Sequence, residues 1–227
     1  MHFLKLLSVS AVFLGVFFFQ APSVNGQIEN DKFSVTAELL LPSGMASKPF
    51  RAYLNGLVNV HPKFQYKPSK HIYVALGPKY MYYTVAEFKV PQKTNGGMHA
   101  YGGGIEAGYS TWFSKRFGME LGVKVGAMQH QLKTDLMASA YKLNAMYVEP
   151  SLSLILASDE AVAYRWIVGY NWMGFDLMPH HLGFDTNGGY SADDFKVGAQ
   201  SIVFGFGMTY YFKNQRSDVF IDDDSEK

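Results

Sequence analysis

The sequence predicts an all-β protein, an eight-stranded antiparallel up-and-down β-barrel that spans a membrane. Segments in which apolar residues alternate with polar or small ones recur along the chain, most clearly from Phe117 to Ala127. A period of two is that of a β-strand with two unlike faces. This segment is also as long as the ~9–11 residues that a tilted strand needs to cross a bilayer. An apolar N-terminal run of the kind that directs export precedes all of these segments. We therefore expect that the strands cross a membrane and that their apolar faces contact lipid.

The composition agrees with a membrane barrel. Hydrophobic residues make up 48% and aromatic residues 16% of the 227-residue chain, which has 22 glycines, as expected for a barrel with aromatic girdles. The mean hydropathy is only −0.04, because apolar residues alternate with polar ones. Lys and Arg number 20 against 19 Asp and Glu, so the net charge does not indicate a nucleic-acid partner. The absence of cysteine excludes a disulfide scaffold, a cysteine metal site and lipidation at an N-terminal Cys.

Residues 1–26 have the pattern of a cleaved export signal. Lys5 gives a positive start, residues 6–19 are mostly apolar, and small residues precede Gln27, as at a signal-peptide cleavage site. A membrane anchor is the alternative, but the run is shorter than the ~20 residues of a spanning helix. We therefore expect a removed signal at 1–26, the barrel at 27–212, and an acidic tail at 213–227 that is solvated and disordered.

Eight strands are predicted in order, each from one apolar face without Asp, Glu, Lys or Arg. Their approximate ranges are Phe33–Leu41, Arg51–Tyr66, Ile72–Ala86, Tyr101–Phe113, Phe117–Ala127, Asn144–Leu156, Tyr164–Trp172 and Ile202–Phe212. The outward residues that define them are Phe33, Val35, Ala37, Leu39 and Leu41; Ala52, Leu54, Val58, Val60, Phe64 and Tyr66; Ile72, Val74, Leu76, Tyr80 and Tyr82; Ile105, Ala107, Tyr109 and Phe113; Phe117, Met119, Leu121, Val123, Val125 and Ala127; Met146, Val148, Leu152, Leu154 and Leu156; Tyr164, Trp166, Val168, Tyr170 and Trp172; and Ile202, Phe204, Phe206, Met208, Tyr210 and Phe212. Pro42–Gly44 is expected to start a loop, and Asn95–Gly97 to form a loop tip. Strand edges cannot stay open in lipid, so the eight strands must close.

The charged strand residues all fall on the opposite face, because a lipid-facing Lys or Arg at the bilayer midplane costs ~2–4 kcal/mol. The predicted interior charge network is Glu38, Arg51, Lys63, Lys79, Glu106, Glu120, Lys124, Glu149 and Arg165. An eight-stranded barrel is just wide enough for its side chains to fill, so we expect a salt-bridged plug without an open channel. A proton or ion relay is the alternative. A three-residue turn after the fourth strand would set Glu106 opposite Lys124.

Connection lengths predict the orientation. The connections at 67–70, 114–116 and 158–160 are short, whereas those at the other end are longer and rich in Gly, Asn and Asp. Membrane barrels keep short turns in the periplasm and long loops outside. We therefore expect a protein of the Gram-negative outer membrane with both mature termini in the periplasm.

Residues 32–212 resemble the small eight-stranded outer-membrane barrels, such as OmpX and the OmpA membrane domain, and the outer-membrane β-barrel-domain proteins of Bacteroidetes. The resemblance rests on repeating strands such as Leu76–Tyr83 and on the aromatic closing strand Phe204–Phe212. It implies assembly by the barrel-insertion machinery, which in that family reads a terminal aromatic residue, matched here by Phe212. A shared fold does not transmit a function.

Enzymatic and metal chemistry find little support in the sequence. A lipid hydrolase or acyltransferase would use a Ser-His-carboxylate arrangement near the outer leaflet, but there is no His-x-Ser arrangement like that of the lipid A deacylase barrels and no Gly-x-Ser-x-Gly. His180 and His181 with Asp185 could bind a metal, although adjacent loop histidines are more often simply exposed. The Gly102-x-Gly104-x-x-Ala107 match to a dinucleotide motif lies within a strand, without the following helix that the motif needs. We expect no cofactor.

The sequence therefore predicts a non-enzymatic outer-membrane barrel with a filled polar interior. It would act through its extracellular loops or as a small subunit of a larger outer-membrane complex; a lipid-modifying enzyme or a minor porin is the alternative. The loop version predicts exposed contact residues in the longest loop, from about Phe175 to Lys196. The candidates are Phe175, Leu177, Met178, His180, His181 and Leu182. The subunit version predicts a protein-covered part of the wall at Ala52 and Gly56 or at Gly103 and Ala107.

Overall fold

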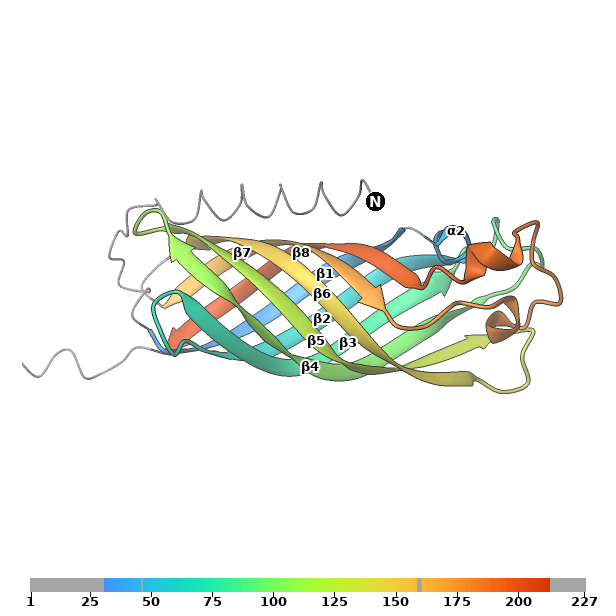
Figure 1. The fold of residues 1–227 in the computed structure, drawn as a ribbon, viewed down its shortest axis with the longest axis horizontal. Helices are drawn as coiled ribbons and strands as arrows, with labels where there is room; N and C mark the ends of the chain where they lie inside the picture. The colour runs from blue at the N-terminus through green and yellow to red at the C-terminus, as the bar shows by residue number, and fades with distance from the viewer. Residues whose placement is uncertain (1–30, 46, 159–160, 213–227) are drawn as a thin grey trace, which may run out of the picture.

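The computed structural model describes residues 31–45, 47–158 and 161–212, and it confirms the predicted fold class. Eight strands form one closed antiparallel barrel, in which each strand pairs with its neighbours in sequence and β1 pairs with β8 (Figure 1). The strands are β1 (Phe33–Met45), β2 (Leu54–Tyr66), β3 (Ile72–Val85), β4 (Gly96–Trp112), β5 (Phe117–Thr134), β6 (Tyr141–Ala157), β7 (Val162–Met173) and β8 (Ala199–Phe212). The predicted signal peptide and acidic tail lie outside the described residues.

The two ends of the barrel differ. At one end, the short-turn end, brief connections join β2 to β3, β4 to β5 and β6 to β7. At the other, the loop end, lie the helix α2 (Lys48–Tyr53) and the 3-10 helices η2 (Pro179–Leu182) and η3 (Ala192–Phe195) (Figure 1). Phe33 pairs with Phe212, so β1 starts and β8 ends at the short-turn end.

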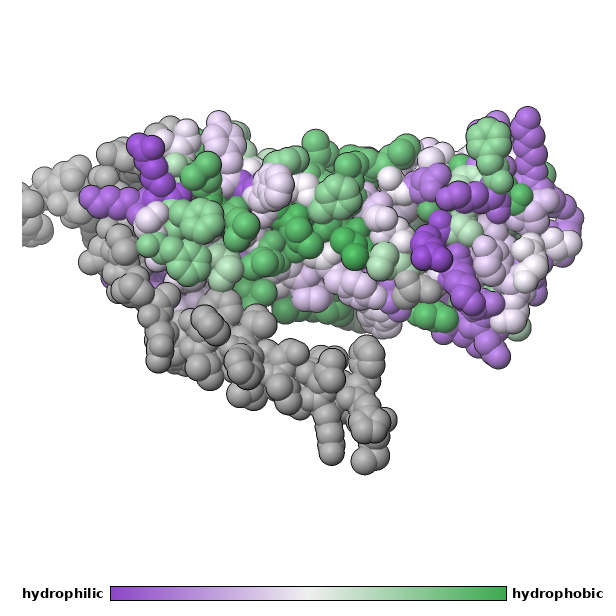
Figure 2. Space-filling view, turned by 90° about the horizontal axis from the view of Figure 1, so that it is seen from above, coloured by the Kyte–Doolittle hydropathy of each residue, from purple (hydrophilic) through white to green (hydrophobic). Residues whose placement is uncertain are grey.

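The outer face of the wall is apolar. Alternate strand residues, among them Leu39, Leu76, Ile105 and Phe206, are exposed, while their neighbours along each strand face the interior. Figure 2 shows hydrophobic side chains gathered over the middle of the molecule and hydrophilic ones concentrated at its ends. An apolar band between polar ends is the surface that a bilayer covers. No helix within the described ranges combines the length and the hydropathy needed to cross a membrane.

Arg51 does not belong to the second strand, as the sequence predicted, but to helix α2. The Ser47 side chain caps this helix by accepting a hydrogen bond from the amide of Phe50 (3.3 Å), and Pro49 occupies the first turn, where a backbone N–H is not needed. The helix buries Phe50 and Tyr53 and leaves Arg51 exposed. The prediction that Arg51 is an interior charge is therefore wrong.

The first residues of β2 face opposite to the prediction. Leu54 is buried and Asn55 is exposed, whereas the sequence placed Leu54 outside. The register of β2 against β3 shifts between Gly56 and Val58, as it does at a β-bulge. Because side chains alternate with a period of two, one inserted residue reverses the two faces. Beyond the bulge, the inward and outward positions are those predicted.

Two other strands extend into predicted loops. β1 continues through Pro42–Gly44 because these residues stay paired with β8. β4 begins at Gly96, where the sequence predicted a loop tip. The backbone there has φ +146°, and a Cβ would lie 2.2 Å from the Lys133 carbonyl oxygen. Glycine thus lets β4 approach β5 closely up to its very start.

Prolines interrupt the ladder of backbone hydrogen bonds at two places. Between β2 and β3 the pairing lapses where the register sets Pro62 opposite Pro78. Between β6 and β7 it lapses at Glu149 and Pro150. A proline has no N–H to donate across the ladder. In a closed barrel of eight strands, these two interruptions lie on opposite sides of the wall.

Candidate functional site

The barrel interior is lined with buried side chains and contains eight of the nine predicted charges. These buried residues are Glu38, Lys63, Lys79, Glu106, Glu120, Lys124, Glu149 and Arg165. They come from every strand except β8. Charges that far from water require partners, and each of them has one.

Glu38 lies at the centre of this network. Its carboxylate oxygens lie 2.7 Å from Nζ of Lys63, 2.8 Å from Nζ of Lys124 and 3.3 Å from Nδ1 of His61. Lys63 also lies 2.6 Å from a carboxylate oxygen of Glu106. Four strands, β1, β2, β4 and β5, therefore meet at one cluster of opposite charges.

The predicted register of Glu106 opposite Lys124 is confirmed, but their ion pairs go to other partners. Lys124 contacts Glu38 and Glu149, while Glu106 contacts Lys63 from β2, two strands away. Gly77 lies on the intervening β3. A Cβ at Gly77 would lie 2.0 Å from the carbonyl oxygen of Pro62 and 2.9 Å from Cα of Lys63, so glycine here allows the backbones of β2 and β3 to approach closely.

Glu149 collects three donors from three strands. It forms an ion pair with Lys79, lies 3.1 Å from Nζ of Lys124, and accepts a hydrogen bond of 2.7 Å from the amide of Asn171. The ammonium group of Lys79 also lies over the ring of Tyr147, 4.5 Å from its centre. Lys79 directly follows a proline of the first ladder interruption, and Glu149 directly precedes the proline of the second. This group therefore connects the two interrupted places across the interior.

Arg165 anchors the network nearer the short-turn end. Its guanidinium group pairs with Glu120 and donates to the hydroxyls of Thr209 and Tyr211. Lys67 lies 3.8 Å from Glu120 and is buried, although the sequence analysis placed it in a turn. Lys67 was missed, and so was the His61 contact to Glu38. The period of two could have predicted that Lys67 faces the interior, since it lies an even number of residues after the inward residue Lys63.

The interior offers one group of side chains with metal-ligand chemistry, but it does not fit a metal. Within the described ranges, ligand atoms of Glu38, His61 and Glu106 lie within 4.8 Å of one another. The ammonium group of Lys63 is 2.7 Å and 2.6 Å from the two carboxylates. The chain's own cation thus already occupies the position that a metal ion would need.

The loop end of the interior is closed by an apolar cluster. We call the surface above it, α2 together with residues 174–198, the cap. The buried members of the cluster are Phe50, Tyr53, Leu54, Met81, Tyr83, Val85, Met98, Ala100, Met128, Leu132, Tyr147, Met173, Leu177, Leu182, Phe184, Phe195 and Ala199. Strand ends, α2 and the β7–β8 loop all contribute, so the cap and the barrel share one core.

Tyr53 holds the cap together. Its ring packs edge-on against Phe184 and Tyr190, with centres 5.4 Å and 5.7 Å away. Its hydroxyl donates a 3.0 Å hydrogen bond to the carbonyl of Asn187. Burial, with a smaller contribution from Tyr190, raises the pKa of Tyr53 to about 12, so the hydroxyl stays a donor.

The predicted loop contacts are mostly not exposed. Leu177, His181 and Leu182 are buried, Phe175 and Met178 are half-buried, and His180 is exposed. The reason is that η2 turns these side chains onto the barrel mouth, where the hydroxyl of Thr134 donates to the carbonyl of Leu182 (2.8 Å). An exposed apolar contact patch in this segment is therefore wrong.

His181 is held as a neutral ring in this docked loop. Its Nδ1 accepts a hydrogen bond of 3.1 Å from the amide of Met178, and the ring stacks on Tyr141 at 4.3 Å. Burial and, less strongly, the neighbouring His180 lower the pKa of His181 to about 4.

The histidines at positions 61 to 181, all within the described ranges, form no arrangement for nucleophilic catalysis. In the part of the chain that the structure describes, the hydrogen-bonded histidine rings contact a carboxylate, a backbone carbonyl, a tyrosine hydroxyl and a backbone amide. None of those contacts is a serine hydroxyl, so the base–nucleophile pair of a hydrolase is missing from these residues.

A closed barrel of eight antiparallel strands, apolar outside and charged within, is the fold of the small outer-membrane β-barrel proteins. The structure is similar to that of Neisserial surface protein A, with 14% identity and a TM-score of 0.51, over 79% of this chain and 97% of that one. Ail, the attachment invasion locus protein of Yersinia pestis, also matches, with 9% identity and a TM-score of 0.47, over 80% of this chain and 99% of that one. The N-terminal β-barrel domain of Pseudomonas aeruginosa OprF matches with 11% identity and a TM-score of 0.41, over 81% and 100%.

Comparisons of sequence add less. A family model described as a protein of unknown function, DUF3575, matches residues 51–150, which run from α2 into β6. No curated protein matches the chain. The comparisons therefore establish the fold, and the function has to be argued from the residues.

Proposed function

We propose that this chain is a non-enzymatic, non-conducting integral protein of the Gram-negative outer membrane, and that it acts through the cap at its loop end. The observation that carries the proposal is that buried side chains occupy the barrel at three levels along its length. Trp112, Ile155 and Tyr211 pack at the short-turn end, the ion-pair network follows, and the apolar cluster closes the loop end. An interior of this kind leaves the outer surfaces as the places of action.

The cap is polar outside and held in a fixed shape. Lys48 of α2 lies 3.1 Å from a carboxylate oxygen of Asp194 of η3. Ser191 and Asp194 cap η3 reciprocally, and Arg51 and Lys196 are exposed beside them. A fixed surface with charges of both signs favours recognition of a polar partner through paired charges.

Conductance in planar bilayers tests the closed interior. The purified protein is expected to insert without a stable open level, while a porin inserted under the same conditions supplies the positive control. A reproducible single-channel step would contradict the proposal.

Single cysteines test the location and the orientation, because the natural chain contains none. Asn187→Cys lies in the cap and Lys115→Cys in the turn between β4 and β5. A membrane-impermeant maleimide should label Asn187→Cys on intact cells, and Lys115→Cys only after the outer membrane is opened. The reverse pattern would invert the orientation, and labelling of neither in opened cells would refute exposure of these ends.

A role as a small subunit of a larger outer-membrane complex is the second candidate, favoured by a smooth band on the wall. Alanine, proline or glycine occupies neighbouring outward positions on five successive strands, at Ala37, Pro62, Pro78, Gly103 and Ala127. The positions expected on the second strand do not contribute, because Ala52 belongs to α2 and Gly56 lies before the bulge. The native mass after gentle extraction distinguishes the two candidates: a large particle with reproducible companions supports a subunit, and the chain's own mass plus detergent supports a lone barrel.

Assembly would need a further partner. The aromatic closing strand β8 ends at Phe212, which pairs with Phe33. We expect the barrel-insertion machinery to recognise this strand, as the resemblance implies. Replacing Phe212 by alanine should then slow the appearance of folded, heat-modifiable protein in cells without lowering its stability once folded.

A further inference from the structure

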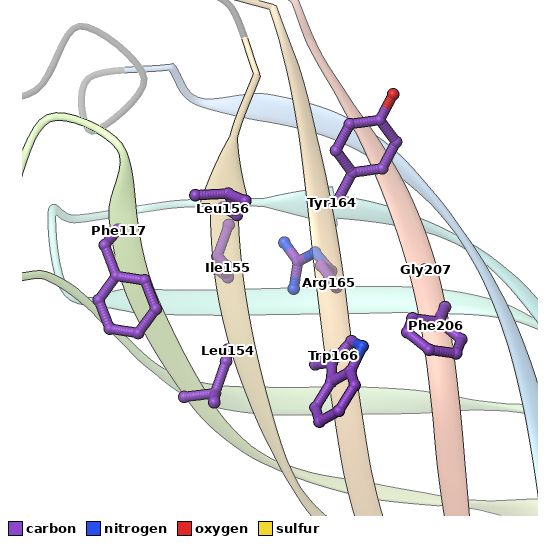
Figure 3. Close-up of a pocket in the computed structure, with 9 residues that line it drawn as sticks. All are labelled: Phe117, Leu154, Ile155, Leu156, Tyr164, Arg165, Trp166, Phe206 and Gly207. Carbon is purple, nitrogen blue, oxygen red and sulfur yellow. The ribbon is translucent and has the colours of Figure 1, made fainter.

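The lipid-facing wall carries an open apolar groove across β5–β8, towards the short-turn end. Figure 3 shows it between two rows of outward side chains. Its volume is about 490 Å³, and its lining is almost entirely apolar. The side chains that form its walls are Phe117, Leu154, Leu156, Tyr164, Trp166 and Phe206.

The register of the strands explains why a groove forms here. One ridge consists of Leu154, Trp166 and Phe206, which are direct cross-strand neighbours, and the rings of Trp166 and Phe206 pack edge-on with centres 5.5 Å apart.

The other ridge consists of Phe117, Leu156 and Tyr164, again cross-strand neighbours. In Figure 3 the phenol of Tyr164 points away from Trp166, which separates the two ridges. The row between them contains Arg165, buried and turned to the interior, and Gly207, which has no side chain. The floor of the groove is therefore low.

An exposed pair of cations adjoins one end of the groove. Lys115 and Arg116 form the turn immediately before Phe117, and both are exposed. The carbonyl of Arg116 accepts a 2.8 Å hydrogen bond from the amide of Ala157, which fixes this turn against the end of β6, next to Leu156. Arginine and lysine at a membrane surface attract anionic head groups, and arginine binds phosphate through two parallel hydrogen bonds.

We propose that this groove binds one anionic phospholipid, with an acyl chain between the two ridges and its phosphate on Lys115 and Arg116. The assignment rests on the proposed function, which sets this wall in a bilayer and the short-turn end in the periplasmic leaflet. It goes beyond general contact with lipid because it requires preference for one head-group charge at one place. Two surface cations should each contribute about a five-fold preference over a zwitterionic lipid.

Fluorescence of Trp166 tests the proposal directly. In the variant Trp112→Phe/Trp172→Phe, Trp166 is the only remaining tryptophan, and it lies in the groove wall. The protein is placed in vesicles of phosphatidylcholine that contain a small fraction of phospholipid with brominated chains. Brominated phosphatidylglycerol should quench Trp166 at a fraction about 25-fold lower than brominated phosphatidylethanolamine does, the product of the two five-fold preferences. Adding Lys115→Gln/Arg116→Gln should bring the two lipids to equal quenching.

Two controls locate the effect. Lys133→Gln/Lys142→Gln removes exposed cations at the loop end and should leave the preference unchanged. The variant that keeps only Trp172, exposed on the wall outside the groove, should be quenched equally by both lipids. Native mass spectrometry of the chain with all its tryptophans gives a second reading. One retained phosphatidylglycerol is expected, and it should be lost in Lys115→Gln/Arg116→Gln.

The outcomes separate the two proposals. Equal quenching of Trp166 by both lipids, with no retained phosphatidylglycerol, overturns the lipid site and leaves the membrane location intact. If no brominated lipid quenches Trp166 and none quenches Trp172, the membrane location itself is overturned.

Discussion

Removing the charge of Glu149 should strongly destabilise the barrel. Glu149 is fully buried and is the carboxylate that pairs with Lys79. In Glu149→Gln the shape is kept, but the ammonium group of Lys79 is left buried without an opposite charge. Breaking a buried ion pair from one side costs about 3–5 kcal/mol, and we expect this loss in the free energy of unfolding.

The reverse change is expected to cost less. In Lys79→Met, Glu149 keeps Lys124 at 3.1 Å and the amide of Asn171 at 2.7 Å, so its charge remains compensated. A loss of about 1–3 kcal/mol is expected, mostly from the missing hydrogen bond. The double variant Lys79→Met/Glu149→Gln should be more stable than Glu149→Gln alone, because no uncompensated ammonium group remains. The coupling energy should then be at least about 1 kcal/mol, the smallest cost expected for Lys79→Met.

Urea unfolding of the protein refolded into lipid vesicles, followed by tryptophan fluorescence, measures these differences. Asp194→Asn is the matched control, since it breaks the exposed pair with Lys48 in the cap and should leave the unfolding curve unchanged. If Glu149→Gln unfolds within about 1 kcal/mol of the natural protein, the interior must be solvated enough to screen its charges. The reasoning from a dry, paired network would then be refuted.

Three further predictions follow from other parts of the molecule. Arg165→Met leaves the buried Glu120 with Lys67 at 3.8 Å and the amide of Gln65 at 3.1 Å and should cost about 1–3 kcal/mol in the same urea assay, while Arg51→Met on the exposed face of α2 should have no measurable effect. The docked β7–β8 loop should open at acidic pH. The pKa of His181 is about 4 in the docked loop and about 6.5 when free, so docking is most stable above about pH 6.5 and weakens as the pH drops towards 4. Proteolysis of the loop should therefore be faster at pH 5 than at pH 7.5, and His181→Gln should abolish that difference. Gly77→Ala should sharply reduce folded, heat-modifiable protein, because its Cβ would lie 2.0 Å from the carbonyl oxygen of Pro62, whereas Gly103→Ala, where the nearest atom is 3.0 Å away, should fold; equal yields would show that the wall moves freely at Gly77.

Much of the fold was accessible from the sequence because lipid imposes a strong rule. A charge on the outer face costs free energy at the midplane, so Glu106 and Lys124 reveal the inward parity of their strands. This parity, together with a three-residue turn, predicts Glu106 opposite Lys124, and that register of β4 against β5 is confirmed. The partner of each charge was not accessible, because long side chains reach diagonally: Lys63 on β2 pairs with Glu106 on β4, and no period in the sequence encodes that reach.

The misses lie where local signals compete. Ser47 followed by Pro49 is a helix-start signal, but the apolar residues after it also fit the alternation of a strand, which is what the period of two predicts there. The bulge at Gly56 changes parity by one residue and leaves no other trace in the pattern. In the long loop, Leu177 and Leu182 fit an exposed contact patch and a docked loop equally well, since composition does not distinguish an apolar side chain that meets a partner from one that meets its own barrel.

The two proline interruptions divide the backbone pairing of the wall into two halves of four strands each. Continuous backbone pairing joins β3–β6, and it also joins β7, β8, β1 and β2. Between the two halves, the pairing of β2 with β3 and of β6 with β7 is interrupted at mid-height. Interior ion pairs link these two halves, so they resist flattening of the barrel at the level where backbone hydrogen bonds are missing. The ion pairs that join one half to the other include Glu38 with Lys124, Lys63 with Glu106, and Arg165 with Glu120.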